Sequence, residues 1–192
     1  NQVGFIIQEC GRIKAARPTA VNLAWGVDRV LERVHAAGSP AARIDAARAE
    51  VAALLGASAS EIVFTSGGSE SDNQAIRGTL EALAGRKRHI VTTRVEHPAV
   101  REVCQHLQKQ GYRLTELSVD SDGGLDLDEL AQAVTPDTAI VSIMWANNET
   151  GVIFPIEEIA PLVKAAGAVL HVDAVQAVGK IPVDLKDSAI DL

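Results

Sequence analysis

Four short apolar segments of the sequence are each followed by polar residues whose types could bind or transform a ligand. These are Gly67, Gly68 and Ser69 after residues 62–64, His97 after 90–93, Asn147 and Asn148 after 138–143, and Asp173 and Gln176 after 168–170. Glycines and a serine at a helix start expose backbone amides and a hydroxyl, which favours an anion such as phosphate. An imidazole can stack on a planar ring or transfer a proton, and a side-chain amide can donate to a ligand oxygen.

Each of these turns also has a purely structural interpretation. Ser69 or Ser71 could cap a helix, and His97 could be a hydrogen-bonded turn residue. Asn147 or Asn148 could form an Asx turn. The glycine-rich turn matches neither the Walker A nor the dinucleotide-binding pattern, because the lysine and the third glycine are missing. No single turn therefore decides between a ligand site and an ordinary turn.

Asp173 has the least ordinary setting, because it ends a segment with the character of a fully buried strand. A buried carboxylate is costly unless it meets a cation or several donors, although it could also cap the following turn. If the ligand were pyridoxal phosphate, Asp173 would hold the proton of the ring nitrogen and keep the ring an electron sink. Gln176, three residues on, would reach the phenolic oxygen of that ring.

The apolar pattern predicts alternating strands and helices to position these turns. Apolar residues at helical spacing between 43 and 55, with Gly56 as a stop signal, predict a surface helix. Strands are expected at 62–64, 89–93, 113–119, 138–143 and 168–172, and helices at about 70–86, 98–110, 127–134 and 156–166. Parallel strands need helical crossovers, so the alternation predicts an α/β fold with a mainly parallel sheet covered on both faces. Ligands bind outside the carboxyl ends of such strands, where the four polar turns lie.

The composition excludes several classes of protein. The 192 residues are 47% hydrophobic, 22% charged and 3% aromatic, which predicts a globular core of Ala, Val, Leu and Ile rather than disorder or a coiled coil. A net charge of −7 repels phosphate backbones, so nucleic acid is not an expected partner. We expect a cytoplasmic protein without membrane contact, because the sequence has no long apolar run and no signal peptide. Cys10 and Cys104 lack zinc-ligand spacing and predict ordinary thiols, with no metal site.

Taken together, the four polar turns resemble the ordered motifs of the cysteine desulfurases, which belong to the class V aminotransferase-like enzymes. The matching stretches are TSGGSESDN at 65–73, VEHPAV at 95–100, MWANNETG at 144–151 and HVDAVQAVGK at 171–180. The third stretch is most similar to the nitrogen-fixation-type branch. The resemblance covers about residues 35–192, beginning with HAAG at 35–38.

The resemblance implies an enzyme that uses pyridoxal 5′-phosphate to take sulfur from L-cysteine, leaving L-alanine and an enzyme persulfide for iron–sulfur cluster assembly. It implies the large domain of a fold type I enzyme, a homodimer, and a sulfur-accepting scaffold protein as a partner. The residues that it assigns to the cofactor are Gly68 and Ser69 at the phosphate, His97 stacked on the ring and assisting proton transfers, Asn148 and Gln176 at the ring hydroxyl, and Asp173 at the ring nitrogen.

The sequence departs from the family pattern at both ends. Residues 1–34 contain no match to the Asp-Asn-Asn-Ala-Thr-Thr-like motif near the family's start, and we leave this segment, with a candidate helix at 25–34, unassigned. The family's Schiff-base lysine would fall just past Leu192 and its sulfur-accepting cysteine further on, while neither Cys10 nor Cys104 matches it. We therefore expect residues 35–192 to be the N-terminal part of the cofactor-binding large domain, inactive by itself.

Two other functions stay open. The four motifs bind cofactor rather than substrate, so another class V enzyme, such as a selenocysteine lyase or an aminotransferase, fits them as well. A non-catalytic remnant that binds a partner or nothing is the third interpretation. A downstream lysine followed by a loop cysteine would favour the desulfurase.

Overall fold

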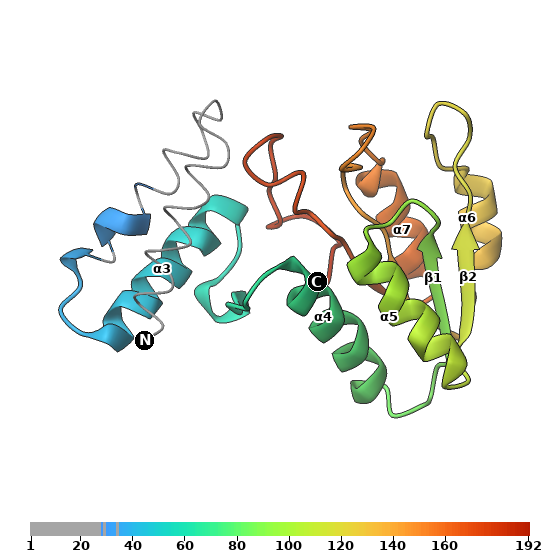
Figure 1. The fold of residues 1–192 in the computed structure, drawn as a ribbon, viewed down its shortest axis with the longest axis horizontal. Coiled ribbons are helices and arrows are strands. Elements are labelled where there is room, and N and C mark those ends of the chain that lie inside the picture. Colours follow the sequence, from blue (N-terminus) through green and yellow to red (C-terminus); the bar gives the residue numbers. More distant parts are fainter. Residues whose placement is uncertain (1–27, 29, 34) are drawn as a thin grey trace. The chain divides into compact units, whose positions relative to one another are not determined.

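The structure is a computed structural model of the chain, and it describes residues 28, 30–33 and 35–192. Its contacts divide the chain into two compact units, residues 1–64 with 177–187 and residues 65–176 with 188–192. Figure 1 traces the elements along the chain. The unassigned segment 1–34, with its candidate helix, lies almost entirely outside the described residues, so the expected boundary at 34/35 stays a prediction. None of the described helices is long and apolar enough to span a bilayer.

The first unit contains helix α3, Pro40–Leu55. The Ser39 hydroxyl accepts a hydrogen bond from the Ala42 amide at 3.2 Å, and Pro40 takes a first-turn position where its missing N–H has no intrahelical partner to lose. Gly56 ends the helix in the left-handed conformation, at φ 70°, which glycine adopts without strain. The helix predicted from the spacing at 43–55, and its stop at Gly56, are confirmed.

The strand predicted at residues 62–64 is wrong. A short 3₁₀ helix, η1 (Ala59–Glu61), precedes these residues, which pair with no strand in the described part of the chain. Their side chains are not buried either, since Val63 is 65% exposed and Phe64 is 42% exposed. β-Branched and aromatic residues favour a strand where a neighbouring strand and a core meet them, and this segment has neither.

The second unit, every residue of which is described, contains a four-stranded parallel sheet in the order β2-β1-β3-β4. The strands are β1 (His89–Thr93), β2 (Arg113–Leu117), β3 (Thr138–Ser142) and β4 (Val169–His171). β1 and β3 are buried along their whole length. The predicted α/β fold and the strands expected at 89–93, 113–119, 138–143 and 168–172 are confirmed to within one or two residues at their ends.

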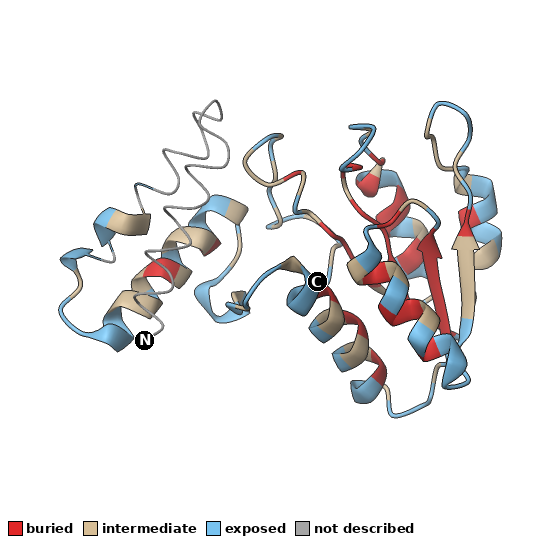
Figure 2. Ribbon diagram, in the orientation of Figure 1, coloured by how far each residue is buried: buried red, intermediate tan, exposed pale blue. Residues whose placement is uncertain are grey.

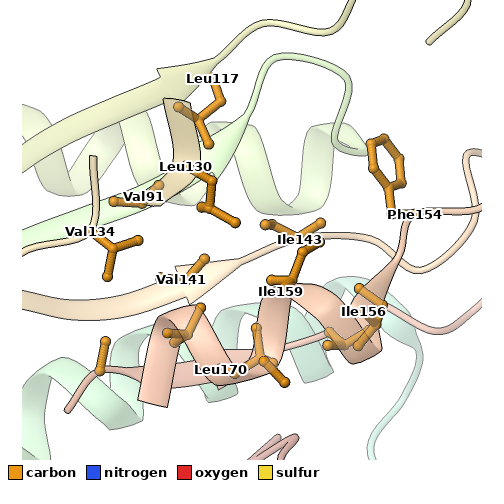
Figure 3. Close-up of a cluster of buried hydrophobic side chains, with 14 of the residues drawn as sticks. Val91, Leu117, Leu130, Val134, Val141, Ile143, Phe154, Ile156, Ile159 and Leu170 are labelled. Atoms are coloured by element: carbon orange, nitrogen blue, oxygen red, sulfur yellow. The ribbon is translucent and has the colours of Figure 1, made fainter. Parts of the chain in front are cut away.

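Helices cover both faces of this sheet. α4 (Gly68–Ala82) and α5 (Pro98–Lys109) pack on one face, and α6 (Leu127–Ala133) and α7 (Ile156–Ala165) on the other. Successive strand residues point to opposite faces, so Ile90 joins the core under α4 and α5 whereas Val91 joins the core under α6 and α7. Figure 3 shows the second of these cores, which is built mainly from Val, Leu and Ile. In Figure 2 the buried residues follow β1 and the inward sides of the helices, whereas β2 is buried only at its end.

The last residues of the chain cover the outer edge of β4. The Val172 amide donates to the Leu192 carbonyl at 2.9 Å, and the Leu192 amide donates to the Leu170 carbonyl at 3.2 Å. The Asp191 carboxylate accepts from the Leu170 amide at 2.7 Å and pairs with Lys164 of α7. These contacts fix the end of β4, from which the last of the four polar turns begins.

Candidate functional site

The six residues predicted to hold a cofactor all lie in the second unit, outside its strands. Gly68 and Ser69 begin α4, His97 follows β1, Asn148 follows β3, and Asp173 and Gln176 follow β4. Because all four strands are parallel, the connections that follow them leave the same edge of the sheet.

The start of α4 has the chemistry of an anion cradle. The helix cap is Gly67, whose carbonyl accepts the Glu70 and Ser71 amides, both at 3.1 Å, and no side chain caps the helix. The interpretation of Ser69 or Ser71 as the cap is therefore wrong. The amides of Gly68 and Ser69 have no recorded partner within the fully described second unit, and Ser69 is exposed. Unpaired amides beside an exposed hydroxyl fit a phosphate group.

Gly68 also allows a close approach between two parts of the site. A Cβ built on Gly68 would lie 3.3 Å from Cγ2 of Val175, which is tighter than most real contacts of this kind. The start of α4 therefore lies against the connection that follows β4. Two of the four polar turns are neighbours in space for this steric reason, whatever ligand they bind.

His97 caps helix α5 and is itself exposed. Its Nδ1 accepts a hydrogen bond from the Ala99 amide at 3.2 Å, which leaves the hydrogen of the neutral ring on Nε2. The structural interpretation of His97 as a hydrogen-bonded turn residue is thus correct. It does not conflict with a role toward a ligand, because the ring is exposed and its orientation is fixed by the cap.

The turn after β3 distinguishes its two asparagines. Asn147 is buried and forms the Asx turn, since its Oδ1 accepts from the Glu149 amide at 3.0 Å and from the Thr150 amide at 2.9 Å. Its Nδ2 donates to the Val95 carbonyl at 3.1 Å, which ties this turn to the loop before His97. The side chain of Asn147 is therefore committed to the fold, whereas the neighbouring Asn148 is exposed.

A pocket of about 270 Å³ brings two of the predicted residues together. His97, from the loop after β1, and Asn148, from the turn after β3, both line it, together with Glu96 and two basic side chains, Arg94 after β1 and Arg101 of α5. The other four predicted residues do not line this pocket. The candidate site is thus divided in the structure between the pocket and the junction of the α4 start with the turn after β4.

Asp173 is buried at the start of the turn that follows β4. Its Oδ1 accepts a hydrogen bond from the Val175 amide at 3.0 Å, and its backbone carbonyl accepts from the Trp145 amide at 3.0 Å. No other hydrogen bond to its carboxylate and no ion pair with a lysine or arginine is recorded within the second unit. One oxygen of a buried carboxylate is therefore left for a cationic partner, such as a protonated ring nitrogen. Gln176, half-buried, belongs to the same turn.

Three further buried ionisable residues lie near this site, namely Asp72, Glu96 and His171. They were not identified as candidates from the sequence. Asp72 Oδ1 lies 3.6 Å from His171 Nε2. The Glu96 Oε1 accepts from the Thr93 hydroxyl at 2.8 Å and from the Met144 amide at 3.0 Å, while its buried Oε2 has no partner. Glu96 therefore holds the loop before His97 onto the end of β3.

The environments of these three groups favour their neutral forms. Burial, aided by the negative charge of Asp173, raises the pKa of Asp72 to about 7. Burial raises the pKa of Glu96 to about 8 against two hydrogen bonds that lower it, and burial lowers the pKa of His171 to about 4. Perturbed groups of this kind gather at functional sites. Among the described residues, no group of three or more His, Cys, Asp or Glu is arranged to hold a metal ion.

The sequence of the chain matches a known protein family. The Aminotransferase class-V family matches residues 26–192. A cysteine desulfurase from Nostoc sp. is 64% identical over 146 residues, which are 76% of this chain and 36% of that protein. The cysteine desulfurase NifS of Azotobacter vinelandii is 54% identical over 147 residues, again 76% of this chain and 36% of the relative. The chain thus spans about a third of the length of these curated relatives.

Solved structures agree with the fold. A NifS-like protein superposes with a TM-score of 0.77 at 40% identity, over 85% of this chain and 50% of that chain. SspA, solved in complex with cysteine, superposes with a TM-score of 0.75 at 33% identity, over 84% of this chain and 51% of that chain.

Proposed function

The chain belongs to the class V aminotransferase family, and we propose that its residues 35–192 are the N-terminal part of the large domain of a cysteine desulfurase. The complete enzyme would use pyridoxal 5′-phosphate to take sulfur from L-cysteine, with L-alanine as the other product. The observation that carries this proposal is the buried Asp173, which has one carboxylate oxygen without a recorded partner and whose turn contacts, through Val175, an amide-rich helix start. The cysteine bound by the structural neighbour SspA supports the choice of substrate.

The residues of this chain would bind the two ends of the cofactor, which when bound supplies an electron sink for bond cleavage next to an amino group. The Gly68 and Ser69 amides and the Ser69 hydroxyl would donate to the phosphate. The Asp173 carboxylate would hold a proton on the ring nitrogen, because a neighbouring negative charge raises the basicity of that nitrogen. His97 would stack on the ring and move protons with Nε2, the ring nitrogen that the cap does not use. Asn148 and Gln176 would contact the ring hydroxyl.

We further propose that the complete enzyme is a cytoplasmic homodimer that passes its sulfur to a scaffold protein for iron–sulfur clusters. Exposed apolar side chains close to the site, Ile153 and Val175, support a subunit interface near it. The covalent attachment of the cofactor and the acceptance of sulfur would belong to a lysine and a cysteine outside these 192 residues. Cys104 is buried in the core under α4 and α5 and cannot accept sulfur there.

The test is the substitution Asp173→Ala in the complete protein that contains these residues. Loss of the partner of the ring nitrogen should abolish the formation of alanine and sulfide from L-cysteine. Asp187→Ala, at an exposed position, is the matched control and should retain normal turnover. Near-normal turnover by Asp173→Ala would overturn the assignment, and turnover of L-selenocysteine alone by the unaltered protein would favour a selenocysteine lyase.

A further inference from the structure

The first turn of α4 contacts β4 and the turn after it at two places, one helical turn apart. Gly68 lies against Val175, with 3.3 Å from a Cβ placed on the glycine to the valine Cγ2. Four residues on, the Asp72 carboxylate lies 3.6 Å from the ring of His171. Residues four apart share one face of a helix. The face of α4 that carries Gly68, at the anion cradle, therefore also contacts β4.

Asp72 is a polar residue on the apolar stripe of α4. Ile76 and Leu80, four and eight residues on, fill the core on the same helix face. Asp72 is only 5% exposed and forms no recorded ion pair with a lysine or arginine of the second unit. An apolar side chain would cost less to bury there. A carboxyl at this position therefore indicates a role beyond packing.

His171 connects Asp72 to the sheet and lies two residues before Asp173. Its Nδ1 lies 2.8 Å from the Ser142 hydroxyl on β3, so the ring is held from both sides. The β3–β4 ladder continues past the strands, with the Trp145 amide donating to the Asp173 carbonyl at 3.0 Å. The chain is thus extended from His171 to Asp173, and residues two apart in an extended segment point to the same face.

The contact between Asp72 and His171 does not depend on an ion pair. Burial raises the pKa of Asp72 to about 7 and lowers the pKa of His171 to about 4, so both groups are mainly neutral just below pH 7. The other ionisable groups that act on this pair are Asp173 and Glu96. A neutral side chain of the same shape as Asp72 should therefore preserve the contact.

We propose that Asp72 is a positioning residue, which through His171 fixes the Asp173 carboxylate relative to the start of α4. The inference rests on the proposed function, because it takes the phosphate to lie at the start of α4 and the ring nitrogen at Asp173. A rigid ligand with an anion at one end and a ring nitrogen at the other is bound well only when the two subsites are held at the matching separation. The contact between α4 and β4 fixes that separation.

A double-mutant cycle on ligand affinity tests this role. The probe is pyridoxine 5′-phosphate, which carries the phosphate and the ring nitrogen but no aldehyde and so cannot react with lysines. Its dissociation constant is measured by equilibrium dialysis for the 192-residue chain and for Asp72→Ala, Asp173→Ala and the double variant. We expect each single substitution to weaken binding about tenfold. The double variant should be no weaker than Asp173→Ala beyond about twofold, because both act on one contact.

Two further variants separate positioning from folding. Asp72→Asn keeps the shape and neutrality of the side chain and should bind within about twofold of the unaltered chain. Gln74→Ala, at an exposed position of α4, is the control and should change nothing. If circular dichroism shows that Asp72→Ala does not fold, Ser142→Ala takes its place in the cycle, since it removes the other partner of His171.

The possible outcomes distinguish the two proposals. Non-additive losses with rescue by Asp72→Asn support the positioning role. Two results would overturn the positioning role while the proposed function stands, given that Asp173→Ala weakens binding. In the first, the Asp72 and Ser142 variants bind as tightly as the unaltered chain. In the second, their losses of affinity add to the loss caused by Asp173→Ala. If Asp173→Ala leaves the affinity unchanged, or the unaltered chain does not bind the probe, both proposals are overturned.

Discussion

Asp72, Glu96 and Asp173 are three buried carboxyls that act on one another electrostatically. Burial raises the pKa of Asp72 to about 7 and that of Glu96 to about 8, and the negative charge of Asp173 contributes to both shifts. Burial therefore favours the protonated forms of Asp72 and Glu96. A protonated ring nitrogen needs a carboxylate partner, and Asp173 suits that role because one of its carboxylate oxygens has no recorded partner.

The raised pKa of Glu96 predicts a pH dependence of stability. The unfolded state ionises near pH 4.5 and the folded state near pH 8, so the contribution of Glu96 is fully present below pH 4.5 and is lost as the pH rises through 8. Glu96→Gln removes this titration. We compare the two free energies of unfolding by subtracting that of the unaltered chain from that of the variant. Between pH 5 and 8, this difference should rise by up to roughly 1 kcal/mol per pH unit.

Urea unfolding followed by circular dichroism at several pH values measures this difference. Glu102→Gln, at an exposed position of α5, is the control and should leave the pH dependence unchanged. A difference between Glu96→Gln and the unaltered chain that stays constant from pH 5 to 8 would show that Glu96 is ionised in the folded state.

Cys104 should be chemically inert in the folded chain. Burial raises the pKa of its thiol to about 12, and the thiolate is the reactive form. Treatment with iodoacetamide at pH 8 followed by peptide mapping should leave Cys104 unmodified, whereas the same treatment in urea should modify it fully. Rapid labelling of Cys104 without denaturant would contradict its placement in the core.

The sequence allowed the prediction of the residues that lie in turns but not of those that hold the turns in place. Gly68, His97 and Asp173 are conspicuous because their types are unusual after apolar segments. Asp72 gave a weaker signal, as the polar member of the helical series that continues with Ile76 and Leu80. Its contact with His171, 99 residues further along the chain, depends on the packing of α4 on the sheet, which the sequence pattern does not specify.

At the level of elements, periodicity predicted the strands and helices of the second unit because each has a neighbour that uses its apolar face. The segment 62–64 has the composition of a strand but no neighbour, so the same reasoning failed there. For α3, the apolar spacing and the stop signal at Gly56 predicted the helix and its C-terminal end, whereas its start at Pro40, after the Ser39 cap, was missed by three residues. Elements whose ends are chemically marked could be predicted closely, whereas pairing depends on the rest of the fold.

The end of α3 predicts a difference between two glycines of the first unit. Gly56 has φ 70°, and a Cβ there would lie 2.1 Å from Oδ1 of Asp184, so Gly56→Ala should lower the free energy of unfolding by about 1–2 kcal/mol. Gly38→Ala is the matched control, because a Cβ at Gly38 would meet nothing within 4 Å. Thermal unfolding of both variants measures the effect, and equal midpoints would contradict the described helix end.

At the level of the whole molecule, exposed apolar side chains predict self-association. Ile153 and Val175 are both largely exposed, and exposed apolar surface favours association. Sedimentation velocity of the 192-residue chain should show a sedimentation coefficient that rises with concentration, and Ile153→Lys should reduce that rise. Gln132→Lys, which adds the same charge on exposed α6, is the control. A monodisperse monomer at every concentration would exclude an interface on this chain.

The reaction of the 192-residue chain with pyridoxal 5′-phosphate itself separates cofactor binding from catalysis. We expect this chain to hold the phosphate and the ring without supplying the covalent attachment. Equilibrium dialysis should show reversible binding that Asp173→Ala weakens. Borohydride reduction followed by peptide mapping should show no stoichiometric pyridoxyl lysine, and the parallel assay of L-cysteine turnover should show no alanine or sulfide. A stoichiometric adduct on one lysine, such as Lys164 or Lys180, together with cysteine turnover would contradict the account, because the chain would then be a catalyst by itself.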